Sequence, residues 1–327
     1  MSLTVLGIET SCDETASAVV RDGRLLSSVV ASQIASHRPF GGVVPEIASR
    51  QHLELIQPTV EEALSLSGVA KGDLNGVAFT NGPGLLGALL VGSTYGKALA
   101  FGLHIPFVGV NHILAHVHAA FLAEEPRFPL LALVVSGGHS DLVRFQAPLS
   151  VEVIGHSLDD AAGEAFDKVA RALGLPYPGG PRLEELARSF EGEGALLPQI
   201  RLGPDHPFDF SFSGLKTAAV RAHEAGASPA AVAKAFQERA ISHLVETTLR
   251  AFSDEDAMLV VAGGVSANTA LRRAFEGALS ERRVVFPPAG MSTDNAAMVA
   301  RIGWEELREG HTSPLDLVPE PLVRPFR

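Results

Sequence analysis

One arrangement of strands, turns and helices occurs twice along this chain, and it limits the folds that the chain can adopt. Residues 3–20 (LTVLGIETSCDETASAVV) and 130–145 (LLALVVSGGHSDLVRF) both read as strand, turn and strand. Residues 76–99 (GVAFTNGPGLLGALLVGSTYGKAL) and 258–275 (MLVVAGGVSANTALRRAF) both read as strand, glycine turn and helix. Alternating strands and helices are typical of α/β proteins. The repetition predicts a duplicated α/β unit with a cleft between its halves.

The repeat also predicts how the chain is divided. We expect the first half to comprise residues 1–126, joined by the C-terminal segment 300–327, and the second half to comprise residues 127–299. Within the second half, the Gly- and Pro-rich segment 187–212 is expected to be an insertion or a lid. Within the first half, the spacing of apolar residues predicts a long amphipathic helix over residues 45–66.

Composition excludes several classes of protein. An apolar content of 46% and a mean hydropathy of +0.21 indicate a globular chain with a sizeable core. The single cysteine, Cys12, and the absence of a charged and then apolar leader predict a cytoplasmic protein without disulfides. The apolar run 82–103 contains Lys97 and several glycines, so we expect a buried helix and no membrane span.

The net charge of −11 argues against a protein that holds nucleic acid by its overall field. An RNA partner would need a local basic patch or companion subunits. The candidate patch is formed by four arginines, which are equally well explained as a solvated helix face: Arg272, Arg273, Arg282 and Arg283.

Three histidines lie in the apolar stretch NHILAHVHAA, residues 111–120. His112 and His116 are four residues apart and share one face of a helix, whereas His118 points to roughly the opposite side. The pair is explained either as two metal ligands or as two core histidines with hydrogen-bond partners. Asp294, in STDNAAM, is either a helix cap or a third ligand contributed by the other half.

The sequence GPGLLG, from Gly82 to Gly87, matches the G-x-G-x-x-G pattern of dinucleotide-binding turns. The acidic residue that binds ribose in such proteins is absent, because the next strand ends in Asn111. Pro83 is also unusual in that turn. We therefore expect these glycines to serve close packing of a helix against the sheet.

Other turns are candidates for binding a nucleotide. The glycines of VVSGGH allow the main chain to approach phosphate, although a plain hairpin explains them equally well. Asn268 is either a contact to a nucleotide or a helix cap. Asp159 and Asp160 are expected to cap the helix that follows them. Asp167 lies too far inside that helix for capping, which leaves ribose binding or an ion pair with Arg171, and Glu184 is either a cap or a ribose ligand.

Nine motifs together resemble a known family: LGIETSCDET, GGVVPEIASRQH, NGPGLLGALLVG, NHILAH, LVVSGGH, DDAAGEAFDKVARALGLPYPGGP, DFSFSGLKTA, AGGVSAN and STDNAAM. In this order they resemble the bacterial tRNA N6-adenosine threonylcarbamoyltransferases, the TsaD family. The resemblance runs nearly end to end and is weakest over residues 188–203. A metalloprotease would instead need H-E-x-x-H, but Ile113 follows His112.

The resemblance implies an actin-like fold, shared with acetate kinase, sugar kinases and heat-shock ATPases. It implies one divalent metal per subunit, Fe²⁺ in the first place and Zn²⁺ in the second, with His118 structural and the ligands His112, His116 and Asp294. It implies an adenine nucleotide (threonylcarbamoyl-AMP, AMP or ATP) on these residues: Val134, Val135, Ser136, Gly137, Gly138, Asp167, Gly180, Glu184 and Asn268.

The implied reaction transfers the threonylcarbamoyl group from threonylcarbamoyl-AMP to N6 of the adenosine 3′ of the anticodon, in tRNAs that read codons beginning with A. AMP leaves. Glu9 and Asp13, in the first turn, are the candidates for a general base. The nearest alternatives are an O-carbamoyltransferase of the same fold and a nucleotide-binding scaffold subunit. A sugar kinase is disfavoured because such kinases hold Mg²⁺ through carboxylates.

The resemblance also implies partners. Besides tRNA, these are a companion synthase that supplies threonylcarbamoyl-AMP, a TsaB-like paralogue that pairs with the first half, and a small TsaE-like P-loop ATPase. The amphipathic helix around residues 46–66 is the candidate pairing face. A homodimer is an option for the isolated chain, and no membrane partner is expected.

Overall fold

The computed structural model describes residues 2–322, which divide into two compact units. Unit 1 contains the residues up to Pro126 and those from Pro287 onward, and unit 2 is Arg127–Phe286. The division expected from the sequence shares the boundary after residue 126 but places the return of the chain at residue 300. The segment 287–299, which includes Asp294, therefore belongs with unit 1.

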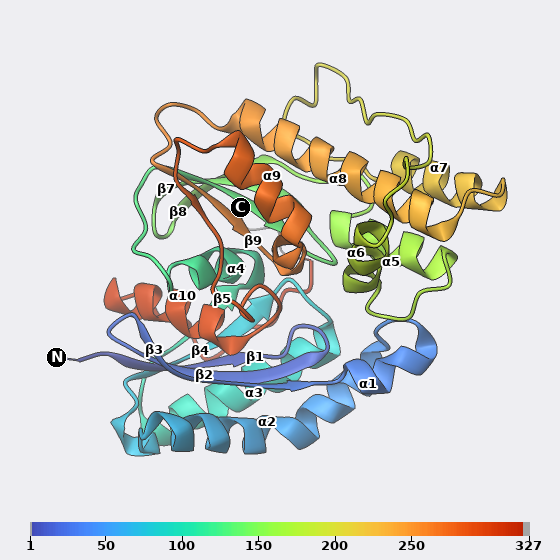
Figure 1. Cartoon of the computed structure of the whole chain (residues 1–327). Helices are drawn as coiled ribbons and strands as arrows, with labels where there is room; N and C mark the ends of the chain where they lie inside the picture. The colour runs from blue at the N-terminus through green and yellow to red at the C-terminus, as the bar shows by residue number, and fades with distance from the viewer. Residues whose placement is uncertain (1, 323–327) are drawn as a thin grey trace. The chain divides into compact units, whose positions relative to one another are not determined.

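Unit 1 is built on a five-stranded mixed sheet in the order β3-β2-β1-β4-β5 (Figure 1). The strands are β1 Thr4–Glu9, β2 Glu14–Arg21, β3 Arg24–Ser32, β4 Gly76–Gly82 and β5 Phe107–Asn111. β1, β2 and β3 form an antiparallel meander, and β4 and β5 run parallel to β1. Every residue of β1 is buried, as expected for a central strand covered on both faces.

Helices cover both faces of this sheet. α2 (Pro45–Ser67) and α3 (Leu86–Leu103) pack together on one face, and α10 (Ala296–Arg308) lies on the other with α4 (His112–Ala120) against it (Figure 1). The short α1 spans Ile34–His37. α10 approaches the sheet very closely, because a Cβ on Gly7 would lie 2.5 Å from the Ala296 carbonyl oxygen. Glycine in β1 therefore allows this helix to reach the sheet.

Unit 2 repeats the same topology, with the order β10-β9-β6-β7-β8. β6 (Leu130–Val135), β7 (Ser140–Ala147) and β8 (Ser150–Gly155) form the antiparallel meander. β9 (Met258–Ala262) and β10 (Val284–Val285) continue parallel to β6. The duplicated α/β fold predicted from the sequence repeat is confirmed.

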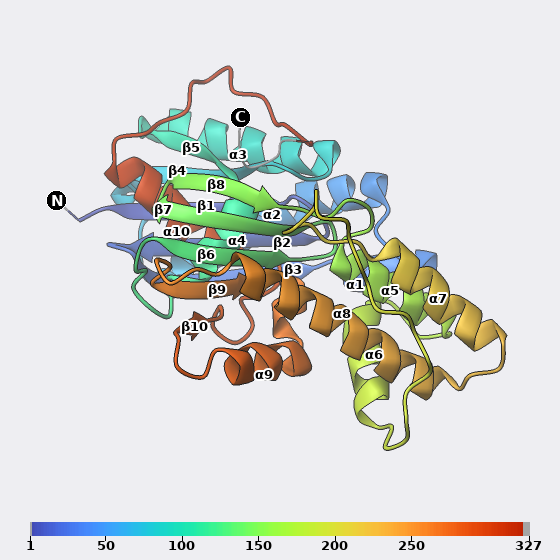
Figure 2. The same cartoon turned by 90° about the horizontal axis from the view of Figure 1, so that it is seen from above.

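The helices of unit 2 differ from those of unit 1. They are α5 Ala162–Ala172, α6 Gly179–Arg188, α7 Ser213–Glu224, α8 Pro229–Ala251 and α9 Thr269–Ala278. Figure 2 shows α5, α6 and α7 gathered beside α8 at one end of the unit. Residues 189–212, within the predicted insertion, carry no helix or strand but bury Leu197, Phe210 and Phe212 in the core. This segment is therefore anchored by its own apolar side chains.

Among the described residues, α3 is the one helix whose length and composition would allow it to cross a membrane. It packs on β4 and α2, and the Lys97 ammonium donates to the Leu317 carbonyl oxygen at 2.9 Å. The side of α3 that faces the sheet is buried, whereas Leu86, Leu90 and Phe101 are exposed. The run 82–103 therefore contains a helix of a folded domain, but not the fully buried helix that was expected.

The buried His243, on α8, leads to a prediction about how the stability of the protein depends on pH. Its ring lies edge-on against Phe210 and Phe212, and its Nε2 accepts a hydrogen bond from the Ser211 amide at 3.4 Å. Burial and the nearby Arg250 lower the pKa of His243 to about 4, against opposing effects of Glu246 and Asp159. Because the unfolded chain takes up this proton near pH 6.5, stability is lost as the pH falls from about 6.5 to 4. The full loss is about 3 kcal/mol.

We expect His243→Gln, which keeps an acceptor but does not titrate, to flatten this decline. The measurement is the free energy of unfolding from urea titrations at several pH values, compared between the variant and the wild type. An equally steep decline in both proteins between pH 6.5 and 4.5 would show that another group causes it.

Candidate metal centre and nucleotide-binding turns

His112 and His116 lie on one face of α4. The helix begins where β5 ends, and the Asn111 side chain caps it by accepting hydrogen bonds from the amides of Ile113 and Leu114. The two imidazole rings are 4.7 Å apart between centroids, and both side chains are buried. His118 points elsewhere and donates from Nδ1 to the Leu114 carbonyl oxygen at 2.9 Å, which is a structural contact.

Asp294 approaches this pair from the turn before α10. Its Oδ1 lies 3.2 Å from His116 Nε2 and 3.5 Å from His112 Nε2. One ligand atom from each of the three residues can be chosen so that all lie within 4.8 Å of one another. The sequence assigned Asp294 to the second half, whereas all three residues belong to unit 1. The reason is that the chain returns to unit 1 at Pro287, before α10 begins, and not at residue 300, which lies inside α10.

These residues fit a divalent cation. Neither ring nitrogen of His116 has a hydrogen-bond partner among the described residues, although the side chain is buried. A buried polar atom without a partner is costly, and an ion would satisfy it. Ligands at about 2.1 Å from a tetrahedral ion are separated by about 3.4 Å, which matches the two distances to Asp294. Two imidazoles and a carboxylate suit Fe²⁺ or Zn²⁺.

Glu9, at the end of β1, orients His112. Its Oε2 lies 3.1 Å from His112 Nδ1 and accepts the Thr80 hydroxyl at 2.6 Å, while Oε1 accepts the Ser11 amide. A carboxylate that holds the second nitrogen of a ligating histidine is common around metal ions. Burial opposes ionisation of Glu9, but His112 and Thr80 outweigh it, so its pKa is lowered. Its role as a general base stays a prediction.

In the ion-free protein, His112 is surrounded by negative charge. Burial alone would lower the pKa of its imidazole, but Asp294 and Glu9 outweigh this effect and raise the pKa to about 9. The positive charge that these carboxylates favour is carried by a proton when no metal ion is bound. Proton and metal ion therefore compete for this site.

Asp13 lies on the turn between β1 and β2. The main chain of this turn is held by His52 Nε2, which donates to the Cys12 carbonyl, and by the Gln33 amide, which donates to the Asp13 carbonyl. The Asp13 side chain is buried, and its Oδ2 has no hydrogen-bond partner among the described residues. Burial, Asp294 and Asp13 raise the pKa of Glu14 to about 9. Asp13 and Asp294 therefore belong to one acidic region.

The turn between β6 and β7 has open space around its glycines. Val134 and Val135 are buried in β6, and Ser136 accepts the Gly163 amide through its carbonyl oxygen. A Cβ added to Gly137 or Gly138 would meet no atom within 4 Å. Packing within the protein therefore does not require glycine here, whereas close approach of a ligand to the main chain would.

Asp167 caps the start of α6. Its Oδ1 accepts hydrogen bonds from the amides of Gly179 at 2.8 Å and Gly180 at 3.1 Å. The prediction that Asp167 does not cap a helix is wrong. Asp167 lies inside α5 but caps the next helix, α6. A Cβ on Gly179 would meet Ala170 at 2.5 Å, whereas Gly180 has open space.

Glu184 and Asn268 connect α6 to the start of α9. Glu184 Oε1 accepts both the amide and the hydroxyl of Thr269. Asn268 caps α9 through the amides of Ala270 and Leu271, and it donates to Gln237. Asp167, Glu184 and Asn268 therefore have structural contacts, and their predicted roles toward a nucleotide remain predictions.

Asp159 and Asp160 do not cap α5, as the sequence analysis expected. α5 begins at Ala162 without a side-chain cap. Asp159 instead accepts the amides of Phe212 and Ser213 at the start of α7, and Asp160 pairs with Lys168 and Lys216. Sequence spacing could not reveal Phe212, Ser213 or Lys216 as partners, because they lie more than 50 residues further along the chain.

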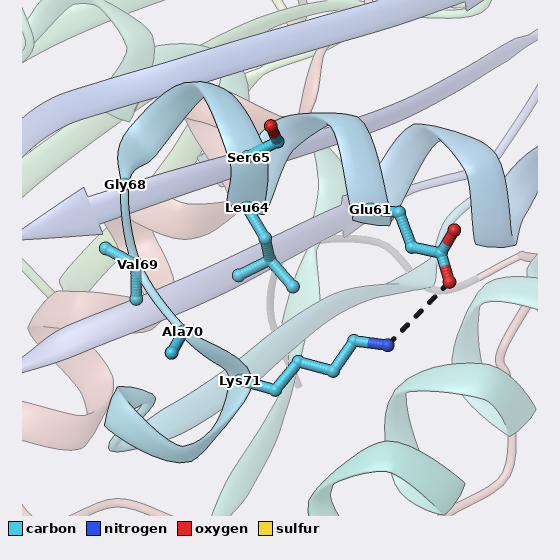
Figure 3. Close-up of a pocket in the computed structure, with 7 residues that line it drawn as sticks. All are labelled: Glu61, Leu64, Ser65, Gly68, Val69, Ala70 and Lys71. Carbon is cyan, nitrogen blue, oxygen red and sulfur yellow. Dashed lines mark ion pairs between the residues drawn. The ribbon is translucent and has the colours of Figure 1, made fainter.

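Gly84 and Gly87 of GPGLLG serve close packing, although against the turn after β1 and against α2, and not of a helix against the sheet as expected. A Cβ on Gly84 would lie 2.8 Å from the Ser11 carbonyl oxygen, and one on Gly87 would lie 3.2 Å from Ser49. A separate pocket of about 300 Å³ lies at the end of α2 (Figure 3). Its Glu61–Lys71 ion pair is half exposed, and it contains none of the candidate site residues.

Comparison with known proteins agrees with the class defined by this fold and site. Two crystal structures share the fold over almost the whole of this chain. HypF from T. kodakarensis has a TM-score of 0.66 at 14% identity, covering 96% of this chain and 49% of that one. Component A of the Acidaminococcus fermentans (R)-2-hydroxyglutaryl-CoA dehydratase has a TM-score of 0.56 at 14% identity, covering 94% of this chain and 99% of that one. The class is therefore the actin-like α/β fold.

The family follows from the sequence. The family model for tRNA N6-adenosine threonylcarbamoyltransferase (TsaD) matches residues 24–301. Proteins of that name are 52% identical in Symbiobacterium thermophilum (96% of this chain, 94% of that one) and 48% identical in Bacillus subtilis (97% and 94%). A third, in Thermus thermophilus, is 50% identical (96% and 96%). The chain belongs to the tRNA N6-adenosine threonylcarbamoyltransferase family.

Proposed function

We propose that this chain transfers a threonylcarbamoyl group from threonylcarbamoyl-AMP to N6 of the adenosine 3′ of the anticodon in tRNAs reading codons that begin with A. AMP is the second product. The observation that carries this proposal is the identity of about half of all residues to transferases of that name, along nearly the whole chain. The test is nucleoside analysis of tRNA after incubation with threonylcarbamoyl-AMP.

Unit 1 supplies the residues that handle the acyl group. His112, His116 and Asp294 would hold a divalent ion, which supplies positive charge to orient the acyl oxygens and to stabilise charge developing on the carbamoyl oxygen. Glu9 accepts from His112 Nδ1, so Nε2, which faces Asp294, would be the nitrogen that gives up its proton and serves as the metal ligand.

Asp13 is the better candidate for the general base. The N6 amine must lose a proton as it attacks the carbamoyl carbon, and a carboxylate oxygen without another partner can accept it. Asp13 Oδ2 meets this condition among the described residues, whereas Glu9 uses its oxygens for Ser11, Thr80 and His112.

Unit 2 supplies the residues for the adenylate. The main-chain amides of Gly137 and Gly138 are assigned to the phosphate that leaves with AMP, because open space surrounds both positions. A Cβ on Gly180 would likewise meet no atom within 4 Å, and Asp167 and Glu184 are assigned to ribose hydroxyls through their carboxylate oxygens. Asn268 carries both a donor and an acceptor for the base. ATP is the alternative nucleotide for the same turns.

Two other functions are less well supported. An O-carbamoyltransferase would share this fold, but the likeness to HypF is at 14% identity and shows the fold alone. A scaffold that binds nucleotide only to organise partners would not need two buried imidazoles facing a carboxylate.

The chain is proposed to act in the cytoplasm with companions: a synthase that supplies threonylcarbamoyl-AMP, a TsaB-like paralogue and a TsaE-like ATPase. An exposed apolar face on unit 1 supports pairing. Leu86, Leu90 and Phe101 share one side of α3 and are 50%, 45% and 66% exposed, and Leu53 of α2 is 66% exposed. We therefore extend the pairing face proposed for α2 to include α3. The isolated chain is proposed to form a homodimer through the same α2–α3 face.

We expect the double substitution Leu90→Glu and Phe101→Glu to abolish pairing, because two charges would have to be buried without partners. Light scattering of the purified chain, mixed with the TsaB-like paralogue, reports the loss of complex. Leu196→Glu, at a residue that is 97% exposed in unit 2, is the control. Complex formation by the α3 variant at wild-type affinity would place the interface elsewhere.

A further inference from the structure

Helices α5 and α7 of unit 2 pack against each other (Figure 2), and a groove of about 510 Å³ is lined by residues of both. Its lining contains four cationic side chains and one anionic side chain. The lining residues are Lys168, Arg171, Ala172, Lys216, Thr217, Val220, Arg221 and Glu224. This concentration of positive charge stands out in a chain with a net charge of −11.

The two lysines of the groove are held by acidic neighbours. Lys168 pairs with Asp160 at 2.9 Å and with Glu164 at 2.8 Å, and Lys216 pairs with the second oxygen of Asp160. Asp160 thereby ties the two lysines together across the groove. The lysine charges are thus partly compensated within the protein.

The two arginines of the groove have no such partners. Arg171, in the last turn of α5, and Arg221, in the last turn of α7, are both exposed. Neither guanidinium makes a hydrogen bond or an ion pair with any residue in the described range 2–322. Their planar guanidinium groups are available to an external anion, and each can donate two parallel hydrogen bonds to phosphate oxygens.

Two of the four arginines in the cluster Arg272, Arg273, Arg282 and Arg283 are engaged within the protein. Arg282 donates to Asp254 and to the carbonyls of Ser253 and Asp256, and it stacks on Phe252. Arg272 donates to the Ser266 carbonyl and stacks on Phe286. These arginines hold the structure together, which leaves less of their donor capacity for a partner.

We propose that the groove between α5 and α7 binds the sugar–phosphate backbone of the tRNA substrate through Arg171 and Arg221. The proposal rests on the proposed function and adds the surface that holds the RNA. Affinity for RNA comes largely from phosphate contacts and falls with salt in proportion to their number. An acidic protein therefore needs its unpaired cations to be gathered in one place.

The test compares tRNA binding by the full chain and by the double variant R171Q/R221Q. The probe is an unmodified tRNA transcript, titrated by fluorescence anisotropy at several salt concentrations from 50 mM upward. We expect about tenfold weaker binding at low salt and a salt dependence reduced by about two units, one for each lost contact. R24Q/R188Q, at two exposed arginines outside both the groove and the Arg272–Arg283 cluster, carries the same change in charge and is expected to bind tRNA like the wild type.

Two further readouts separate the possible failures. AMP-dependent thermal stabilisation is expected to be unchanged in R171Q/R221Q, which shows that the variant is folded. If the wild type modifies tRNA and R171Q/R221Q binds it with unchanged affinity and salt dependence, the groove proposal is overturned and the proposed function stands. An equal loss in R24Q/R188Q would also overturn it, because the effect would be one of net charge. A wild type that does not bind tRNA, and does not modify it even when its companions are present, overturns both.

Discussion

Replacing His112 and His116 with alanine is expected to remove the bound metal ion and to reduce threonylcarbamoyl transfer by about 10²–10³-fold, the usual cost of losing one centre of charge stabilisation. The two imidazoles supply two of the three side-chain ligands that the structure brings together. Elemental analysis of purified protein is expected to give one metal ion per wild-type chain and close to none for the variant.

Two other variants make this result interpretable. Asp294→Asn keeps the shape of the third ligand but removes its charge, and is expected to lower metal occupancy without disturbing α10. His104→Ala with His311→Ala removes two exposed histidines of the same unit and is expected to keep the ion. Unchanged metal content in a folded His112→Ala, His116→Ala protein would contradict the assignment of the ligands.

Gly137→Val is expected to abolish nucleotide binding without destabilising the ligand-free chain. The added side chain enters open space in the protein, so the free energy of unfolding without ligand is expected to be unchanged. The same side chain would block approach of a phosphate to the main chain. In the wild type, AMP or ATP at ~100 Kd adds about 2.7 kcal/mol of stability, and the variant is expected to lose that gain.

Gly72→Val is the matched control, because a Cβ at Gly72 in unit 1 also enters open space. Thermal unfolding with and without nucleotide measures both effects. If AMP stabilised Gly137→Val as much as it stabilises the wild type, the turn between β6 and β7 would not be part of the nucleotide-binding site. Stabilisation of the wild type by NAD, but not by ATP, would favour the dinucleotide-binding interpretation of GPGLLG.

Local patterns in the sequence predicted the elements and the fold well, for a physical reason. The alternation of buried strands and helices, and its repetition, follow from periodicities of two and 3.6 residues that lie within each segment. The same periodicity placed His112 and His116 on one face of α4, so the approach of the two imidazoles could be predicted from the sequence. The packing role of Gly84 was predicted because the ribose-binding carboxylate was missing.

Contacts between distant segments could not be predicted in this way. Glu9 and His112 are 103 residues apart, and Asp159 caps a helix that begins more than 50 residues later. Asp167 was judged from its position in its own helix, although its partners belong to the next one. A carboxylate can cap any helix start that packing brings within reach, and one sequence does not show which one that is.

The most direct test of the central claim is mass analysis of the nucleosides of tRNA. Unmodified tRNA reading codons that begin with A is incubated with threonylcarbamoyl-AMP, the purified chain and its two companions, and is then digested. We expect N6-threonylcarbamoyladenosine in an amount that exceeds the protein, little product without the companions, and about 10²–10³-fold slower formation with the His112→Ala, His116→Ala variant. Absence of the modified nucleoside from the complete mixture, with each protein folded and the donor intact, would contradict the account.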